Sequence, residues 1–180
     1  MLVESVTVVA SWLDHATYGV NALRSSVPRY GSDVAPPTVR VIQMFRDEEA
    51  ALGKAPIGDL PALEVGLQGE MMAAMGPAVR PFPEDSTIDV TIRYIADRTT
   101  DTALAMRHSA YTMRIVRRSL PLLMLTVDGN TARVVNNSQV LGVSNIRTVA
   151  LYGSDNDTVT TGGVIVTLQM RDLWASSPAP

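Results

Sequence analysis

The hydrophobic repeat changes its period within residues 87–120, and this change constrains the fold more than any other feature of the sequence. Ile88, Val90 and Ile92 alternate with polar residues, which is typical of a strand with one buried face. From residue 100 onward, the apolar residues recur every three or four positions, which is the period of a helix. The sequence therefore predicts a strand that is followed directly by an amphipathic helix.

One flank of this predicted helix is basic, and residues 103–119 contain no acidic residue. Arg107, Arg114 and Arg118 fall within about 40° of one another at about 100° per residue. A solvated helix face ordinarily mixes charges of both signs, so we expect either a plain wet face or a contact with an acidic partner, such as another copy of the chain. The apolar side is predicted to comprise Ala103, Met106, Ala110, Met113, Val116 and Leu120.

The remaining periodic segments complete an α+β pattern. A helix of about sixteen residues is expected within residues 6–23, capped by Ser5 and weak in its last turns. Further strands are expected at residues 38–44, 62–70, 131–153 (interrupted near Gly142) and 164–174. The order is helix, three strands, helix, two strands. It predicts one domain over residues 1–180, with a mostly antiparallel sheet of about five strands and two main helices on one face.

Two long connections separate these strands, at residues 45–61 and 71–86. Loops of this length are usually functional or disordered, and methionine adapts to irregular partner surfaces. We interpret both loops as candidate partner contacts; the alternative is a solvated acidic loop and methionines that tuck under the sheet edge. The candidate contact residues are Asp47, Glu48, Glu49, Met71, Met72 and Met75. Residues 175–180 are expected to form a loose tail.

Composition excludes several classes of protein. The 180 residues carry a formal net charge of −3, whereas a dedicated nucleic-acid binder is normally strongly basic, so no sequence-specific nucleic-acid binding is expected. The absence of cysteine excludes disulfides and thiolate zinc sites. No apolar stretch reaches about eighteen residues, so no membrane partner is expected. The first twenty residues include Glu4 and Asp14 and do not resemble a signal peptide, which predicts the cytoplasm as the place of synthesis and folding.

Signatures of catalysis and of metal binding are weak. His15 neighbours Asp14, but adjacent helical residues do not face each other, and His108 is expected to be solvated or at an interface. The run Asp155-Asn156-Asp157 lacks the ligand spacing and the glutamate of a calcium loop. We therefore predict no enzyme activity and no catalytic, cofactor or metal site.

The pattern resembles a known family. The first helix leads through YGVNALRSSVPRYGSDVAPPTVRVI; the strand IDVTIRYI precedes ADRTTDTALAMRHSAYTMRIVRRSLPLL; and the chain ends with GGVIVTLQMRDLW. In element order, in the arginine-bearing helix after a strand and in the final alternating strand, these segments resemble the tail terminator, or tail-completion, proteins of tailed bacteriophages.

The resemblance implies a structural virion protein without a cofactor. Family members form a ring, commonly a hexamer, that caps the tail tube, ends its polymerisation and offers a surface to the head connector. The implied partners are further copies of the chain, the tail tube protein and a connector or stopper protein, in a virion assembled in the host cytoplasm. Within such a ring, we expect Arg107, Arg114 and Arg118 to meet Asp47, Glu48 and Glu49 of the next copy.

Other interpretations remain open at this stage. The protein could be a head–tail connector, a stopper or another neck or minor tail protein. It could also be a small ligand-binding domain or enzyme that uses residues 71–86 as a lid.

Overall fold

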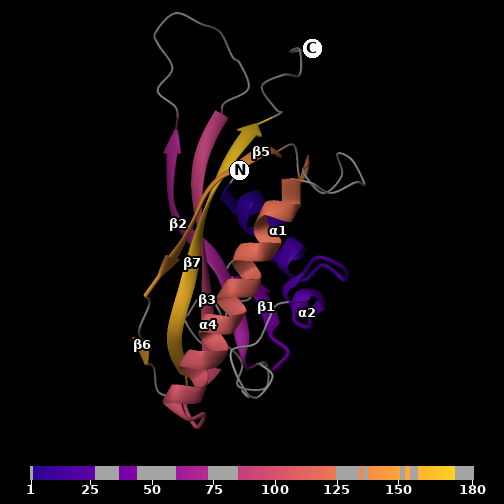
Figure 1. Cartoon of the computed structure of the whole chain (residues 1–180). Helices are drawn as coiled ribbons and strands as arrows, with labels where there is room; N and C mark the ends of the chain where they lie inside the picture. Colours follow the sequence, from indigo (N-terminus) through magenta and orange to yellow (C-terminus); the bar gives the residue numbers. More distant parts are fainter. Residues whose placement is uncertain are drawn as a thin grey trace, which may run out of the picture.

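A single sheet forms one layer of the molecule, and helices cover one of its faces (Figure 1). The computed structural model describes residues 2–26, 37–43, 60–72, 85–124, 134–135, 138–150, 153–154 and 158–172. The elements are α1 (Leu2–Leu13), α2 (Val20–Leu23), β1 (Arg40–Gln43), β2 (Ala62–Met72), β3 (Asp85–Asp97), α4 (Thr102–Ser119), the 3₁₀ turn η2 (Leu120–Met124), β4 (Val134–Val135), β5 (Ser138–Val149), β6 (Gly153–Ser154) and β7 (Thr158–Asp172).

The sheet has the strand order β1-β2-β3-β7-β5-β4, and the two-residue strand β6 pairs with β7. Only β1 and β2 are parallel; every other described pair is antiparallel. Five strands have four residues or more, and α1 and α4 are the two main described helices. The predicted α+β class and the mostly antiparallel sheet are confirmed.

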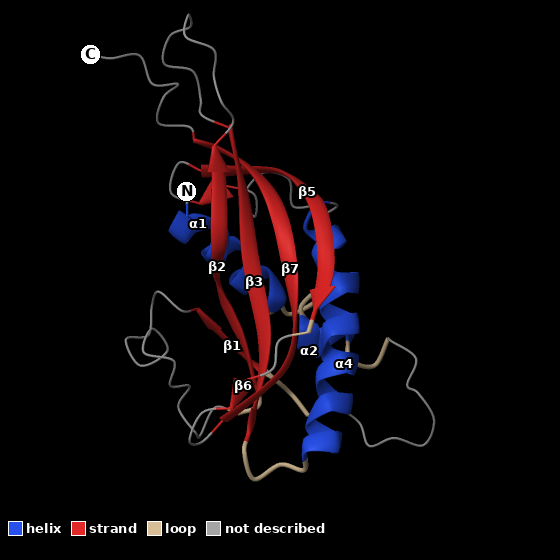
Figure 2. Ribbon diagram, turned by 90° about the vertical axis from the view of Figure 1, so that its left-hand side faces the viewer, coloured by secondary structure: helices blue, strands red, loops and turns tan. Residues whose placement is uncertain are grey.

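The core lies between the sheet and the two main helices (Figure 2). Along β3, every second side chain faces this core, as the alternating sequence predicts. The side chains of Ile88, Val90, Ile92 and Tyr94 are all at most 1% exposed. Helix α1 contacts β1, β2 and β3, whereas α4 contacts β7 and β3. The two helices therefore cover neighbouring parts of the same face.

The first helix begins and ends earlier than predicted. Its C-terminal boundary is Leu13, after which His15 Nδ1 accepts hydrogen bonds from the backbone N–H groups of Thr17 (3.1 Å) and Tyr18 (3.2 Å). A Cβ on Gly19 would lie 2.4 Å from the carbonyl oxygen of His15, so only glycine fits this turn. The Ser5 cap was also wrong, because Ser5 lies inside α1 and its hydroxyl donates to the Leu2 carbonyl.

Three strands extend into segments that were predicted as loops, and one of them is β3, which begins at Asp85. Met71 and Met72 belong to β2, since they pair with Thr87 and Ser86 of β3. Strand β7 begins at Thr158, so the glycine pair at residues 162–163 lies within a strand.

The predicted interruption near Gly142 is a register shift in the pairing of β5 with β7, between Val140 and Gly142. The 131–153 segment is otherwise divided into β4, β5 and β6. The remaining loop residues 45–59 and 73–84 and the tail 175–180 lie outside the described residues.

Candidate functional site

Helix α4 carries the candidate site, and its first turn is fixed by its N-cap. The side chain of Asp101 accepts a hydrogen bond from the Leu104 N–H at 2.9 Å, which satisfies one of the unpaired donors at the start of the helix. Arg117 and Arg118 lie in the last turn, where cations interact favourably with the helix dipole. The basic residues at the C-terminal end of α4 therefore stabilise the helix itself, whether or not they also bind a partner.

Polar contacts, one of them fully buried, tie the C-terminal half of α4 to the first two helices and to the turn between them. Trp12 Nε1 donates to the Ser119 carbonyl at 3.0 Å, and Ser119 Oγ donates to the Tyr18 carbonyl at 2.6 Å. Tyr111 Oη donates to the Arg24 carbonyl at 3.1 Å. Trp12 also stacks on Tyr18, with ring centroids 5.5 Å apart. These contacts hold the arginine-bearing end of the helix in a defined orientation.

The buried side of α4 includes small and polar residues beside large apolar ones such as Met113, Ile115 and Val116. Ala105, Ser109, Thr112 and Ser119 are at most 2% exposed. Thr161 of β7 donates to the Ala105 carbonyl at 3.5 Å, and a Cβ on Gly162 would lie only 2.8 Å from Ser109 Oγ. Small side chains on both partners therefore let α4 approach β7 closely.

The opposite face of α4 is exposed, and we call it the α4 arginine face. It comprises Ala103, Met106, Arg107, Ala110, Arg114, Arg117 and Arg118, all of which are exposed. The predicted exposure of Arg107, Arg114 and Arg118 is confirmed. Ala103, Met106 and Ala110, predicted on the apolar side, lie instead on this face, and Met106 is 42% exposed. Met113, Val116 and Leu120 are buried as predicted, and Ser109 and Thr112 are buried as well.

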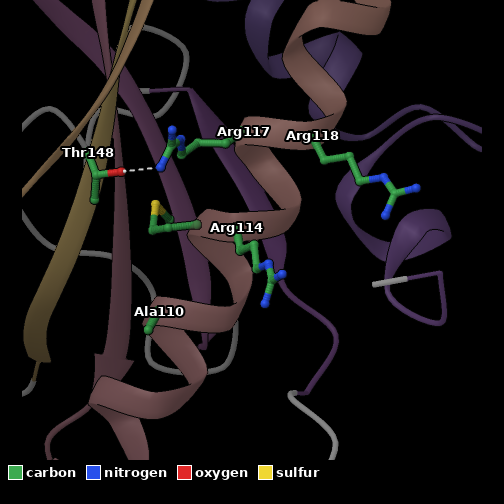
Figure 3. Close-up of a pocket in the computed structure, with 6 residues that line it drawn as sticks. Ala110, Arg114, Arg117, Arg118 and Thr148 are labelled. Atoms are coloured by element: carbon green, nitrogen blue, oxygen red, sulfur yellow. Dashed lines mark hydrogen bonds between the residues drawn. The ribbon is translucent and has the colours of Figure 1, made fainter. Parts of the chain in front are cut away.

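A groove between α4 and β5 adjoins the α4 arginine face (Figure 3). We call it the α4 groove; its volume is about 600 Å³, and it is lined by Ala110, Met113, Arg114, Arg117, Arg118 and Thr148. Arg117 Nη1 donates to Thr148 Oγ1 at 3.3 Å, and Arg118 Nη1 donates to the Ser26 carbonyl at 3.4 Å. Both bonds are longer than the common range for N–H···O bonds, so an anionic partner would compete well for these guanidinium groups.

Sequence reasoning missed two residues of the α4 groove. Arg117 lies about 100° around the helix from Arg118, outside the narrow strip that spacing alone selects. Its position next to Arg118 was the only feature of the sequence that pointed to Arg117. Thr148 comes from β5, and only the fold brings that strand beside α4. Because these two side chains contact each other, the groove spans two layers of the fold.

Among the described residues, three ion pairs lie on the sheet face that points away from the helices. They join Arg93 to Glu64 at 2.6 Å, Arg147 to Asp89 at 3.4 Å and Arg171 to Asp85 at 2.8 Å. The hydrogen bond from Arg171 holds the pKa of Asp85 below its ordinary value. These acidic side chains are therefore already engaged within the subunit, on the side remote from α4.

The histidines have structural surroundings. His15 serves the turn after α1 and packs against Trp12 and Tyr18, with ring centroids 5.3 Å from each. His108 was expected to be solvated or at an interface; its Nε2 is buried with no hydrogen-bond partner among the described residues, and burial lowers its pKa, so the solvated alternative is wrong and the interface alternative stays a prediction. Within the described ranges, no group of three or more acidic or histidine side chains could hold a metal ion.

The other predicted contact residues are not brought to α4 by the described part of the chain. Met71 and Met72 lie in β2. Met75 and the acidic residues Asp47, Glu48 and Glu49 lie outside the described residues. The predicted pairing of arginines with the acidic run therefore stays a prediction.

The sequence matches no protein-family model, and no curated protein is significantly similar to it. Among the described helices, none combines the length and the apolar character needed to cross a membrane. Function is therefore inferred from the surfaces of the molecule.

Proposed function

We propose that this protein is a structural subunit of a tailed-bacteriophage virion that forms a homo-oligomeric ring, most simply a hexamer, at the end of the tail tube. Such a ring ends polymerisation of the tube protein and offers a docking surface to the head connector or stopper protein. Assembly takes place in the host cytoplasm, and the mature location is the tail or neck of the virion. The proposal assigns the chain no cofactor and no catalysis.

The observation that carries this proposal is the composition of the α4 arginine face. Protein interfaces are enriched in methionine and arginine and depleted in lysine, glutamate and aspartate relative to the rest of the surface. The α4 arginine face has Met106 and four arginines, and residues 102–119 contain no lysine or acidic residue. Lys54 is the only lysine in the sequence, so fourteen of the fifteen basic residues are arginine.

Arginine suits a contact between proteins better than lysine does. Its planar guanidinium binds a carboxylate through two parallel hydrogen bonds and is more weakly hydrated than an ammonium group. A one-signed arginine surface therefore selects an acidic counterpart and rejects a second basic surface. In a closed ring, this selection fixes the register of each copy against the next.

A ring that matches the tube on one side only explains how such a subunit would end the tube. A tube grows because each added layer presents the surface that receives the following layer, which is an open, heterologous arrangement. A ring that matches this surface on one side only leaves no place for a further layer. The contacts within the ring must be heterologous as well, since one flank of each copy meets the other flank of its neighbour.

Native mass spectrometry of the purified protein from about 1 to 100 µM tests the proposal. We expect a discrete closed oligomer of six copies. Reversing Arg107 and Arg114 to glutamate is expected to leave a folded monomer, with the circular dichroism of the wild type. Arg98→Glu, in the turn before α4, serves as the matched charge control and is expected to retain the oligomer. A monomer at every wild-type concentration would overturn the ring.

A further inference from the structure

The residues of α1 that are not buried form a narrow strip along one side of the helix. Seven of the twelve residues of α1 are buried. Apart from Leu2, those left at least partly exposed lie within an arc of about 100°, at about 100° per residue. We call this the α1 strip; it comprises Val3, Glu4, Thr7, Ser11 and Asp14. Asp14 directly follows the helix and continues its path, because its N–H donates to the Ala10 carbonyl at 3.0 Å.

The α1 strip and the α4 arginine face lie on opposite flanks of the molecule. Thr7 of the α1 strip donates to Gln43 Oε1 of β1 at 3.4 Å. Arg117 of the α4 arginine face donates to Thr148 Oγ1 of β5 at 3.3 Å. Strands β2, β3 and β7 separate β1 from β5 in the sheet (Figure 2). A closed ring joins one flank of each copy to the other flank of the next, so it requires two different exposed surfaces on opposite flanks.

The two surfaces have the same spacing along their helices. Four residues of each recur at intervals of four, four and three positions; they are Val3, Thr7, Ser11 and Asp14 on one helix, and Met106, Ala110, Arg114 and Arg117 on the other. Each set spans about 16.5 Å at about 1.5 Å per residue. Two parallel helices from different copies would therefore bring every member of one set level with its counterpart in the other.

One end of each set is apolar. Among the described residues, the exposed large apolar side chains are those of Leu2, Val3 and Met106. The first two lie in the first turn of α1, and the third lies at the matched end of the set on α4. Val3 is 50% exposed and Met106 is 42% exposed, so a contact between them would remove apolar surface of both from water.

The other end of each set is charged, and the two charges are opposite. Asp14 and Arg117 are both exposed. Residues 1–23 contain no lysine or arginine, whereas residues 102–119 contain no acidic residue. A parallel arrangement places Asp14 beside Arg117. An antiparallel arrangement would place Asp14 against Met106 and desolvate a carboxylate without a partner, so the charges select the parallel arrangement.

We propose that the α4 arginine face of one copy packs in parallel on the α1 strip of the next copy, with Thr7 level with Ala110 and Asp14 level with Arg117. This contact rests on the proposed ring and specifies how its subunits join. The small side chains of Thr7 and Ala110 let the two helices approach closely at the middle of the contact. Each copy in the closed ring makes the contact twice, once through α1 and once through α4.

A two-fold contact between the α4 helices of two copies is the competing arrangement. Such an isologous contact sets one patch against itself. Every charged residue of the α4 arginine face is an arginine, so this arrangement brings only like charges together, which is unfavourable. It would also end at two copies and close no larger ring. The α1 strip of the next copy is therefore the better counterpart.

Cysteine cross-linking tests the contact in the full-length protein, because the chain has no cysteine of its own. Thr7→Cys and Ala110→Cys are made as separate variants, mixed and oxidised with copper phenanthroline. A disulfide requires Cα atoms within about 7 Å, so a cross-link between the two variants reports their register. We expect a disulfide-linked heterodimer on a non-reducing gel, and a ladder of up to six copies when both changes are in one chain.

Ala103→Cys is the matched control for register. Position 103 is also on the α4 arginine face but lies about 10.5 Å from position 110 along the helix. Mixed with Thr7→Cys, this variant is expected to cross-link at least tenfold less than Ala110→Cys does. Each single variant oxidised alone is expected to stay unlinked.

An exchange of charges gives a second, independent measurement. Arg117→Glu is expected to raise the concentration at which half of the copies are assembled by about threefold or more. Adding Asp14→Lys to the same chain is expected to restore the wild-type concentration, because each contact between copies again joins opposite charges. A double variant that assembles no better than Arg117→Glu alone would contradict the proposed register.

Native mass spectrometry of the same samples separates failure of this contact from failure of the ring. A ring that forms without the cross-link between Thr7→Cys and Ala110→Cys, or that links equally well through Ala103→Cys, would overturn the contact and spare the ring. Ala110→Cys that links to itself would assign α4 to the two-fold arrangement. A wild-type protein that never oligomerises would refute the proposed function, and this contact with it.

Discussion

The close approach of α4 to β7 predicts that Gly162→Ala destabilises the protein through one identifiable contact. A Cβ at this position would lie 2.8 Å from Ser109 Oγ, whereas ordinary van der Waals contacts of a Cβ begin near 3.4 Å, so the helix or the hydroxyl must move by about half an ångström. The hydroxyl cannot rotate into free space, because Ser109 is only 1% exposed. The substitution therefore forces a shift in packed surroundings.

The expected magnitude follows from two opposing effects. Overpacking of this kind costs about 1–3 kcal/mol, while replacing glycine by alanine lowers the entropy of the unfolded chain and returns about 0.4–1 kcal/mol. We expect a net loss of about 1 kcal/mol in the free energy of unfolding, which corresponds to a decrease of about 2–4 °C in Tm for a chain of this size. Urea unfolding at one fixed protein concentration would measure it.

A double-mutant cycle assigns the loss to this contact. Ser109→Ala removes the clashing oxygen, so Gly162→Ala should cost about 1–2 kcal/mol less in that background. Gly142→Ala is the matched control, because its Cβ would meet only the flexible end of Gln169, at 3.3 Å, and we expect a change within about 0.5 kcal/mol. A coupling near zero, or an equal loss at Gly142, would refute the reasoning.

Three further predictions concern single side chains. Asp101→Ala should cost about 1 kcal/mol of stability in urea unfolding, whereas Asp101→Asn should retain most of the cap. Trp12→Phe leaves the buried Ser119 carbonyl without its donor and should cost about 1–3 kcal/mol in the same assay. Burial raises the pKa of Tyr94 from 10.0 to about 12, so the unfolded chain releases this proton first as pH rises. Stability should therefore fall between pH 10 and 12 by about 2–3 kcal/mol more in the wild type than in Tyr94→Phe; equal losses in the two proteins would contradict this.

The fold class followed from periodicity because β3 and α4 each bury a continuous face. Boundaries were wrong where tertiary contacts outweighed local signals. The glycine pair at residues 162–163 is typical of a turn, yet it lies in β7 because α4 packs against it at Ser109. The first helix ends at Leu13 because the His15 side chain accepts the backbone N–H groups that follow. Spacing alone does not reveal such side-chain acceptors.

The candidate site was only partly predictable for the same physical reason. Hydropathy assigns Met106 to the core and Ser109 to water, but a helix that approaches a strand closely needs small residues at the contact, and their polarity matters less. The arginine spacing predicted the exposed flank correctly. Arg117 entered the site only through Thr148, which lies far along the chain. Nothing in the spacing of α4 points to β5.

Register shifts on β2 and β5 are expected to limit the aggregation of this protein at high concentration. They lie between Leu67 and Gly69 on β2, and at two places between Val140 and Asn145 on β5. A straight strand edge accepts further strands without limit, which leads to fibrous aggregates, and bulges interrupt that template. At high concentration, copies are therefore expected to associate through specific side-chain contacts and not through unlimited pairing of strand edges. Deleting Leu141 to straighten β5 should turn a clear concentrated solution into one that binds thioflavin and scatters light.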